Sequence, residues 1–442
     1  MLSISRLRGQ GYDRASNMRG EFNGLQRKIL DENSYALYVH CYAHRLQLVV
    51  VSVANSCSSI HDFFEYISLI VNTTSASCKR MDALREAQHN DIVRRLENGE
   101  ISKGRGLHQE SRWGSHHISL IRLDQMWSSA IDVFSTVDEV GRVPSQAAGL
   151  IEKMECFKFA FILKLMLKLF GITNELSKML QRKDLNIVLA MELVDDVKAP
   201  LTTLRESGWD DLFDNVQKLC TAKGIPVPNI DAKILVRGRL RLEVGTVTNL
   251  HHYHAEILYV AIDKICVEMD HRFSEGSNIV LNSFSCLDPK NSFSKFDVEK
   301  LVRLADIYHA DFSDIDRGTI REQLETYVVH VRRHISFSTC VDAQSLAMKM
   351  VQTDKHFVFP LVYKLIELTL ILPVSTESVE RAFSPMSIIK TKLRNKINDE
   401  WFNDLMICYT ERKIFKSLDD VDIIRTFTAK RSRRGNLPPS FM

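Results

Sequence analysis

The chain has 442 residues, of which 45% are hydrophobic and 26% are charged, and its formal net charge is +3. This length allows two or three domains with substantial cores, and the composition is ordinary for a globular protein. A charge so close to zero gives no general signal of nucleic-acid binding, so any basic surface must be local.

Cysteine usage argues against a disulfide-rich or zinc-ribbon protein, and hydropathy argues against a membrane-spanning one. The nine cysteines are odd in number and scattered, and none forms a C-x-x-C pair. This pattern favours free thiols in a reducing compartment over a disulfide framework or a zinc ribbon. The most apolar run, residues 157–172, contains three lysines, which predicts a buried amphipathic helix and no membrane span. The start of the chain is polar and basic, so we expect a soluble, intracellular protein without a signal peptide.

Strand and helix patterns alternate in the first fifty residues. A short polar strand runs into Asp13, a helix follows from about residue 15 to residue 30, and a strand rich in Tyr, Leu and Val covers residues 35–41. A second helix begins at residues 43–44. This β-α-β-α series predicts that both strands lie in one sheet, with Asp13 at the carboxyl end of a strand. Ligands and metals bind at that edge in open α/β sheets.

The long middle of the chain has helical periodicity. Residues 60–96 read as helices and residues 97–106 as a loop, and residues 115–350 are almost wholly helical. Breaks fall at residues 224–228 and 286–289, and a basic loop covers residues 237–241. The predicted fold is therefore a small α/β core joined to a large, mostly α region.

The last hundred residues read as helices followed by a basic tail. A strongly apolar helix over 359–370 ends at Pro373, a second helix follows Ser375 or Thr376, and Asn398 is placed to cap a third. The tail from Thr428 is basic and then Pro-rich, so we expect it to be disordered. Its basic run is either a nuclear localisation signal or a solvated charge run.

Three blocks in this order resemble the hAT-type transposases. They are G-x-D-x-A-S-N-M at residues 11–18 with H-C-x-A-H-x-L-x-L at 40–48, then Arg112-Trp113, then the block from Leu372 to Ser384. The resemblance is closer to transposase-derived proteins of the MYM-type zinc finger protein 1-like and TTF-type zinc finger-like groups. It implies a nuclear or otherwise cytoplasmic protein derived from a transposable element.

The resemblance also implies a domain order. Residues 1–115 would be part of a ribonuclease H-like core, residues 116–350 an all-helical insertion, residues 351–418 the hAT carboxyl-terminal dimerisation region that completes the core, and residues 419–442 a disordered basic tail. A ribonuclease H-like sheet needs strands before Asp13, which would take about 12–15 residues. The sequence offers about five, so we expect an amino-terminally truncated relative.

The family's chemistry uses three acids that hold two metal ions. Carboxylates suit Mg²⁺, and the paired metals position a nucleophile and stabilise charge on the phosphate. Asp13 and Glu380 match two of the acids, and the first acid would lie before this chain. The prediction is a catalytically inactive protein without a cofactor, in which Asp13 caps a helix and Glu380 is a solvated glutamate. The alternative is an active DDE-type recombinase that uses Mg²⁺ and takes its first acid from upstream sequence.

Two other pairs could bind ligands. Cys41 and His44 form a C-x-x-H pair, but a structural zinc needs four ligands and no second pair lies at suitable spacing. We expect the thiol to be buried under the sheet, with His44 hydrogen-bonded near the site.

The resemblance implies that Arg112 and Trp113 contact DNA, with the tryptophan stacked on an unpaired base. Core packing is the alternative role of Trp113.

The histidine-rich run at residues 251–254 also suggests a metal site. The sequence shows no cluster of acidic or cysteine partners beside it, so we expect a partly exposed helix start.

Residues 355–416 form the closing block of the chain, and their apolar content points to self-association. The resemblance implies a homodimer through this region, and packing inside one chain is the alternative. The residues predicted to contribute are Phe359, Leu372, Phe383, Trp401 and Phe402. The functional expectation is a non-enzymatic, dimerising protein with possible DNA contacts, and an unstable fragment without function is a further alternative.

Overall fold

A computed structural model gives the fold of the chain. It describes residues 3–13, 15–19, 23–75, 78, 80–86, 89, 116–140, 144–182, 185–234, 247–274, 279–376, 385–386, 388–390 and 396–430. The chain divides into two compact units, Met1–Val374 and Ser375–Met442, each of which is described by itself.

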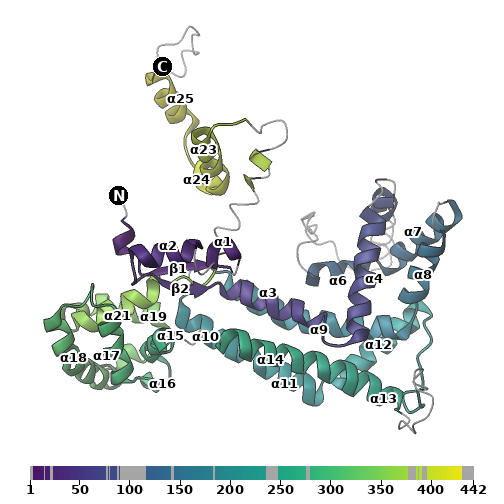
Figure 1. The fold of residues 1–442 in the computed structure, drawn as a ribbon, viewed down its shortest axis with the longest axis horizontal. Helices are drawn as coiled ribbons and strands as arrows, with labels where there is room; N and C mark the ends of the chain where they lie inside the picture. The colour runs from purple at the N-terminus through teal and green to yellow at the C-terminus, as the bar shows by residue number, and fades with distance from the viewer. Residues whose placement is uncertain are drawn as a thin grey trace. The chain divides into compact units, whose positions relative to one another are not determined.

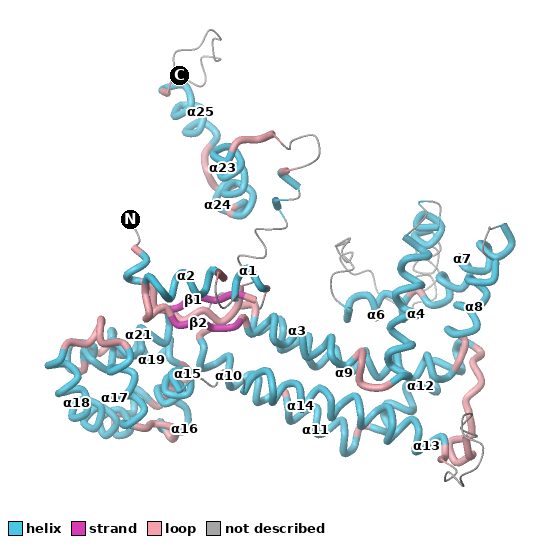
Figure 2. The backbone as a smooth tube through the Cα atoms, in the orientation of Figure 1, coloured by secondary structure: helices cyan, strands magenta, loops and turns pink. Residues whose placement is uncertain are grey.

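The protein is mostly α-helical, with 76% of residues in helices. Two strands occur in the described residues, β1 (Gly9–Tyr12) and β2 (Leu37–His40), and they pair in parallel. The α/β piece expected at the start of the chain is thus present as one two-stranded sheet. Two strands do not establish a ribonuclease H-like core, so the predicted fold class is confirmed only as mostly α with a small parallel sheet (Figures 1 and 2).

The first half of unit 1 contains the helices α1 (Ser16–Arg19), α2 (Leu25–Glu32), α3 (Tyr42–Val53), α4 (Ser58–Ser75), α6 (His116–Gln125), α7 (Trp127–Val140), α8 (Pro144–Met154), α9 (Phe157–Leu180), α10 (Ile187–Asp196), α11 (Lys198–Ser207) and α12 (Trp209–Lys223). The second half contains α13 (Asn249–His251), the π-helix η2 (His252–Tyr259), α14 (Val260–Ser274), α15 (Ile279–Phe284), α16 (Lys290–Phe293), α17 (Val298–Ile307), α18 (Asp314–Arg333), α19 (Ala343–Gln352), α20 (Lys355–Val358) and α21 (Pro360–Ile371). Short 3-10 helices lie at Ile4–Arg6 (η1), Ser285–Leu287 (η3) and Ile335–Phe337 (η4).

Side-chain hydrogen bonds hold the sheet against its connecting turn. The Gln10 amide is buried and donates to the carbonyl of Ala36 over 2.9 Å. The Asn33 amide donates to the carbonyls of Ile4 and Leu7, each over 2.7 Å. The Gln10 bond ties β1 to the turn before β2, and the Asn33 bonds tie that turn to the residues before β1.

The single helix predicted between the strands is instead two helices. α1 ends at Arg19, and α2 begins after Gly24, which has an extended backbone at φ −67° and ψ 153°. Gly24 is a weak helix former, and its conformation here ends the periodic pattern that Met18, Leu25 and Ile29 share.

The core of unit 1 is organised around α9, the apolar helix predicted at residues 157–172. α3, α6 and α12 pack against it, and Trp127 meets Phe159 edge to face with ring centroids 5.5 Å apart. Phe161 is fully buried and lies 5.0 Å from the Tyr253 ring. The lysines of α9 lie at partly or fully exposed positions, as the amphipathic pattern required.

A second group of helices packs beside the sheet. α18 contacts α17 and α21, and α19 contacts α21. Arg8, which directly precedes β1, forms an ion pair with Asp311 between α17 and α18. Residues of the predicted helical insertion therefore pack against the α/β piece (Figure 1). No helix among the described residues is long and apolar enough to span a membrane.

Unit 2 contains the helices α23 (Asp399–Thr410), α24 (Arg412–Phe415) and α25 (Asp420–Ala429). Asn398 caps α23 by accepting a hydrogen bond from the Trp401 backbone N–H over 2.9 Å, which confirms the predicted cap. The expectation of disorder from residue 419 onward is wrong for 420–429, because an acidic first turn and alternating apolar residues form α25 there.

Candidate functional site at the carboxyl edge of the sheet

Both strands end at the same edge of the sheet. Tyr12 and His40 are paired in the parallel register, so Asp13 and Cys41 follow side by side. The Cys41 N–H donates to the Tyr12 carbonyl over 3.1 Å and extends this pairing by one bond. The predicted position of Asp13, at the carboxyl end of a strand in a shared sheet, is confirmed.

Asp13 makes the turn from β1 into α1. One of its carboxylate oxygens accepts a hydrogen bond from the Ala15 N–H over 3.0 Å. The Tyr38 hydroxyl donates to its carbonyl over 3.2 Å, and the Tyr38 ring stacks on Tyr12 at 6.4 Å. Burial raises the pKa of the Tyr12 hydroxyl. These contacts place Asp13 in the turn between β1 and α1, and its roles as a helix cap or a metal ligand stay predictions.

Cys41 and His44 lie at the start of α3. Cys41 is the N-cap residue and is 2% exposed, so its thiol is buried as expected. The ring of His44 lies 5.5 Å from the ring of His40, the last residue of β2. Within the part of the chain that the structure describes, no group of three or more His, Cys, Asp or Glu residues could hold a metal ion.

The segment that follows α21 packs directly on the sheet. A Cβ atom on Gly9 would lie 2.6 Å from Cδ of Pro373, and one on Gly11 would lie 3.0 Å from Cβ of Pro373. The Tyr42 N–H, at the start of α3, donates to the Val374 carbonyl over 2.9 Å. The beginning of the closing block thus reaches the same edge as Asp13, although the two lie about 360 residues apart in the sequence.

We expect Gly9→Ala to destabilise unit 1 by about 1–3 kcal/mol, because the added methyl group overlaps the Pro373 ring and the backbone around it must shift. The measurement is the thermal unfolding midpoint. Gly318→Ala is the matched control, since a Cβ there has nothing within 4 Å and the residue lies inside helix α18. The control should be neutral or stabilising. An equal fall in the unfolding midpoint of both variants would contradict the packing of Pro373 on β1.

Four of the predicted site residues lie outside the described residues. They are the candidate acid Glu380, the candidate DNA contacts Arg112 and Trp113, and the candidate dimerisation residue Phe383. Their roles therefore stay predictions.

The other predicted dimerisation residues fall into two groups. Phe359 and Leu372 are only 5% and 4% exposed and belong to the core of unit 1. Trp401 is 67% exposed on α23, and the Phe402 ring lies 5.6 Å from the Lys390 ammonium. Phe359 and Leu372 are therefore core residues of unit 1. The closing block exposes apolar side chains in both units, with Phe357, Val358 and Ile371 being 75%, 56% and 56% exposed in unit 1.

Sequence reasoning missed the acidic partner of the histidine-rich run. His252 lies in the π-helix, and its Nδ1 is 2.6 Å from a carboxylate oxygen of Glu256, while His251 Nε2 is 4.0 Å from the other oxygen. The His252–Glu256 spacing of i, i+4 lies on one face of an α-helix as well, so the sequence itself offered this partner. The His254 ring instead lies tilted against the Trp209 ring with centroids 4.6 Å apart, and burial lowers the pKa of His254.

A buried pair of carboxyl groups was also missed. Asp288 is 3% exposed and shares a side-chain hydrogen bond with Glu192 of α10. Lys290 and Lys295 approach Glu192 to 2.6 and 3.2 Å. Burial, and then the hydrogen bond that the protonated Asp288 carboxyl donates to Glu192, raise the pKa of Asp288 to about 6. No local pattern reports this pairing, because the two acids lie almost 100 residues apart.

One family model matches the start of the chain. It is DUF4371, the ZMYM1/FAM200, RNase-like domain, and the match covers residues 1–24. These residues include β1, Asp13 and α1, and they cover residues 11–18 of the first block of the resemblance but not its second part at 40–48. The match links this segment, 24 of 442 residues, to an RNase-like domain.

Proposed function

We propose that this chain is a transposase-derived, catalytically inactive protein that acts by self-association. The RNase-like match over residues 1–24 supports the transposase origin. The exposed apolar surface of unit 2 is the observation that supports self-association.

The small number of carboxylates at the carboxyl edge of the sheet supports the proposal that the protein is catalytically inactive. Asp13 is the only carboxylate among the described residues 9–13, 37–44 and 372–376. Two metal ions about 4 Å apart need several carboxylate oxygens, more than Asp13 alone supplies. The other candidate acid, Glu380, lies outside the described residues. The site residues Cys41 and His44 then have a structural role beneath this edge.

The second candidate function is a DDE-type recombinase that takes Mg²⁺ and acts on DNA. The place of Asp13 at a strand end favours it. We expect no Mg²⁺-dependent nicking of supercoiled DNA by the chain, and no difference between the wild type and Asp13→Ala, because the donor set is too small. Nicking by the wild type that disappears in Asp13→Ala would instead support the recombinase.

Unit 2 exposes apolar side chains on each of its helices. Within its described residues, none of α23, α24 and α25 has a buried side chain. The most exposed large apolar side chains on these elements are Trp401, Ile407, Ile414 and Phe427, which are 67%, 53%, 60% and 52% exposed. Apolar surface of this kind, on three short amphipathic helices, is typical of a protein interface. We propose a second copy of the chain as the occupant, giving a homodimer.

We expect the double substitution Trp401→Ala and Ile407→Ala to weaken self-association at least about tenfold, because large buried apolar side chains dominate interface energies. The measurement is the weight-average mass over a concentration series. Ile315→Ala is the matched control, since Ile315 is 79% exposed in unit 1. Loss of association in the control alone would place the interface elsewhere.

Contacts with DNA through Arg112 and Trp113, and nuclear localisation through the basic residues 430–434, are parts of the same proposal. Aromatic stacking on unpaired bases and a cluster of arginines are chemically suited to these roles.

A further inference from the structure

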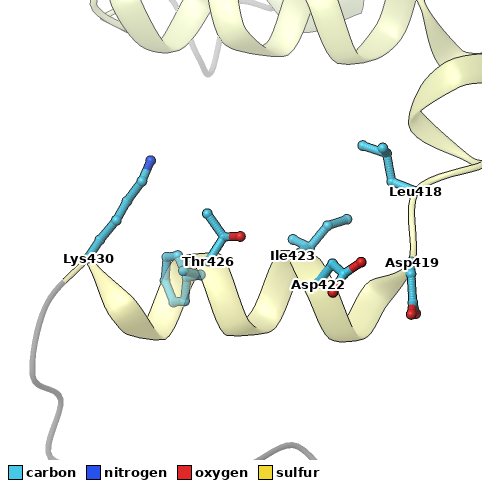
Figure 3. A pocket seen from close by; sticks show the side chains of 7 residues that line it. Leu418, Asp419, Asp422, Ile423, Thr426 and Lys430 are labelled. Atoms are coloured by element: carbon cyan, nitrogen blue, oxygen red, sulfur yellow. The ribbon is translucent and has the colours of Figure 1, made fainter.

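Helix α25 presents an apolar stripe along one side. A groove is lined by Leu418, Asp419, Asp422, Ile423, Thr426, Phe427 and Lys430. From 419 onward these positions recur at intervals of three and four residues, which places them on one helix face. Figure 3 shows Ile423, Thr426 and Lys430 extending to the same side of the helix. Ile423 and Phe427 are 39% and 52% exposed, so the centre of the stripe is apolar and accessible.

Two charged residues of this face, Asp422 and Lys430, are placed symmetrically about Thr426. Asp419 also lines the groove, and Asp422 pairs with Arg425 of the same helix over 2.9 Å. Asp422 precedes Thr426 by four residues and Lys430 follows it by four, which is about one helical turn in each direction. The acidic group lies toward the amino-terminal end of α25 and the basic group at its carboxyl-terminal end, where each is also favoured by the helix dipole. A face with this arrangement is complementary to itself when turned by 180°.

We infer that α25 pairs antiparallel with α25 of a second copy, crossing at Thr426, with Lys430 of each chain beside Asp422 of the other. This inference rests on the self-association proposed above and assigns it a particular helix and register. Ile423 and Phe427 fill the seam, and the small Thr426 side chain allows the two helices to approach closely. Because the contact is two-fold symmetric, it closes as a dimer and does not propagate.

The size of α25 sets the strength of this pairing. A helix of ten residues is about 15 Å long and cannot by itself bury the roughly 1,200–2,000 Å² of a stable interface. Leu418 and the exposed side chains Ile414 and Phe415 of α24 continue the apolar surface next to it. Association through α25 is therefore expected to be weak and to decrease as salt screens the two ion pairs.

The test uses charge exchange in the full chain, with mass measured by sedimentation over a concentration series. Lys430→Glu alone and Asp422→Lys alone each place like charges opposite one another and should weaken association about tenfold or more. An equimolar mixture of the two variants should recover wild-type association, because the mixed dimer restores both attractions. Asp420→Lys is the control, since Asp420 carries the same charge on the same helix but does not line the groove.

The possible results separate this inference from the broader proposal. Far-ultraviolet circular dichroism first establishes that each variant keeps its helix content. Recovery in the mixture, with the control unchanged, supports the antiparallel register. A dimer that weakens in the Trp401 and Ile407 variant but not in Lys430→Glu overturns the α25 pairing and leaves self-association standing. A wild type that stays monomeric at all concentrations overturns both.

Discussion

Replacing Asp311 by alanine should destabilise unit 1 by about 2–4 kcal/mol, because the substitution leaves the guanidinium of Arg8 largely buried without its counter-charge. The Arg8 side chain is 10% exposed and that of Asp311 is 24% exposed. Arg8 Nη2 donates to an Asp311 carboxylate oxygen over 2.8 Å, and its Nη1 donates to the carbonyls of Ser5 and Leu7. This hydrogen bond with Asp311 raises the pKa of the Arg8 guanidinium.

The effect should extend to the sheet. Arg8 directly precedes β1, and the neighbouring Tyr35 hydroxyl lies 2.6 Å from Nε2 of His309. Losing the ion pair should therefore loosen the contact between the first strands and the segment that joins α17 to α18. Increased hydrogen exchange of residues 8–12 and 35–40 is the specific readout, besides a lower unfolding midpoint.

Asp314→Ala is the matched control for this prediction. Asp314 also pairs with an arginine, Arg317, but its side chain is 93% exposed. Exposed pairs contribute little, so this variant should stay within about 0.5 kcal/mol of the wild type. A similar loss in both variants would mean that burial does not determine the strength of the Arg8 pair.

Replacing Asp288 by asparagine should stabilise the protein at pH 8 by about 1–3 kcal/mol and leave it unchanged near pH 4. The pKa of Asp288 is raised to about 6 in the fold, from an ordinary value of 3.8. A raised carboxyl pKa means that its favourable contribution is complete below pH 3.8 and is lost as the pH rises through 6. Asparagine retains the shape and the hydrogen-bonding capacity of the protonated acid at every pH, so the loss does not occur.

The surroundings of Asp288 explain the sign. Its Oδ1 accepts from the Lys290 N–H over 3.1 Å, and Lys295 lies 3.6 Å from its Oδ2. Burial opposes the ionisation of Glu192, but hydrogen bonds from Asp288 and from the two lysines outweigh it, so the pKa of Glu192 is lowered. Glu192 therefore carries the negative charge of the pair, and Asp288 carries the proton at mildly acidic pH.

Unfolding midpoints measured between pH 4 and pH 8 test this prediction. Asp297→Asn provides a comparison of opposite sign, because the Lys300 N–H bonded to Asp297 lowers the pKa of that carboxyl. Loss of the Asp297 carboxylate should reduce stability at pH values above the pKa that this group has in the unfolded chain, and should have no effect at lower pH. If Asp288→Asn instead lowers the midpoint at pH 8, the ionised form of Asp288 is the stabilising one and the assignment of the proton is wrong.

The features that the sequence predicted are those that depend on local patterns. Helix α9, the Asn398 cap and the end of α21 before Pro373 follow from periodicity and capping chemistry within a few residues. The parallel pairing of β1 and β2 follows from the β-α-β order. The family match over residues 1–24 supports the first block of the resemblance.

The features that the sequence did not reveal depend on distant residues or on unusual local geometry. The Arg8–Asp311 pair joins residues about 300 positions apart, and the Glu192–Asp288 pair joins helix α10 to the turn between η3 and α16. The π-helix at residues 252–259 has no sequence signature, and Gly24 divides a helix that the apolar spacing made continuous. In each case tertiary contacts or backbone conformation outweighed the local pattern.

Sedimentation equilibrium of the full chain tests the central proposal most directly. The chain has a mass of 50.7 kDa. Self-association through unit 2 predicts a mass that rises with concentration toward twice this value. A mass that stays at that of one chain at every concentration would contradict the account, because the apolar side chains of α23, α24 and α25 would then not be covered by a second copy.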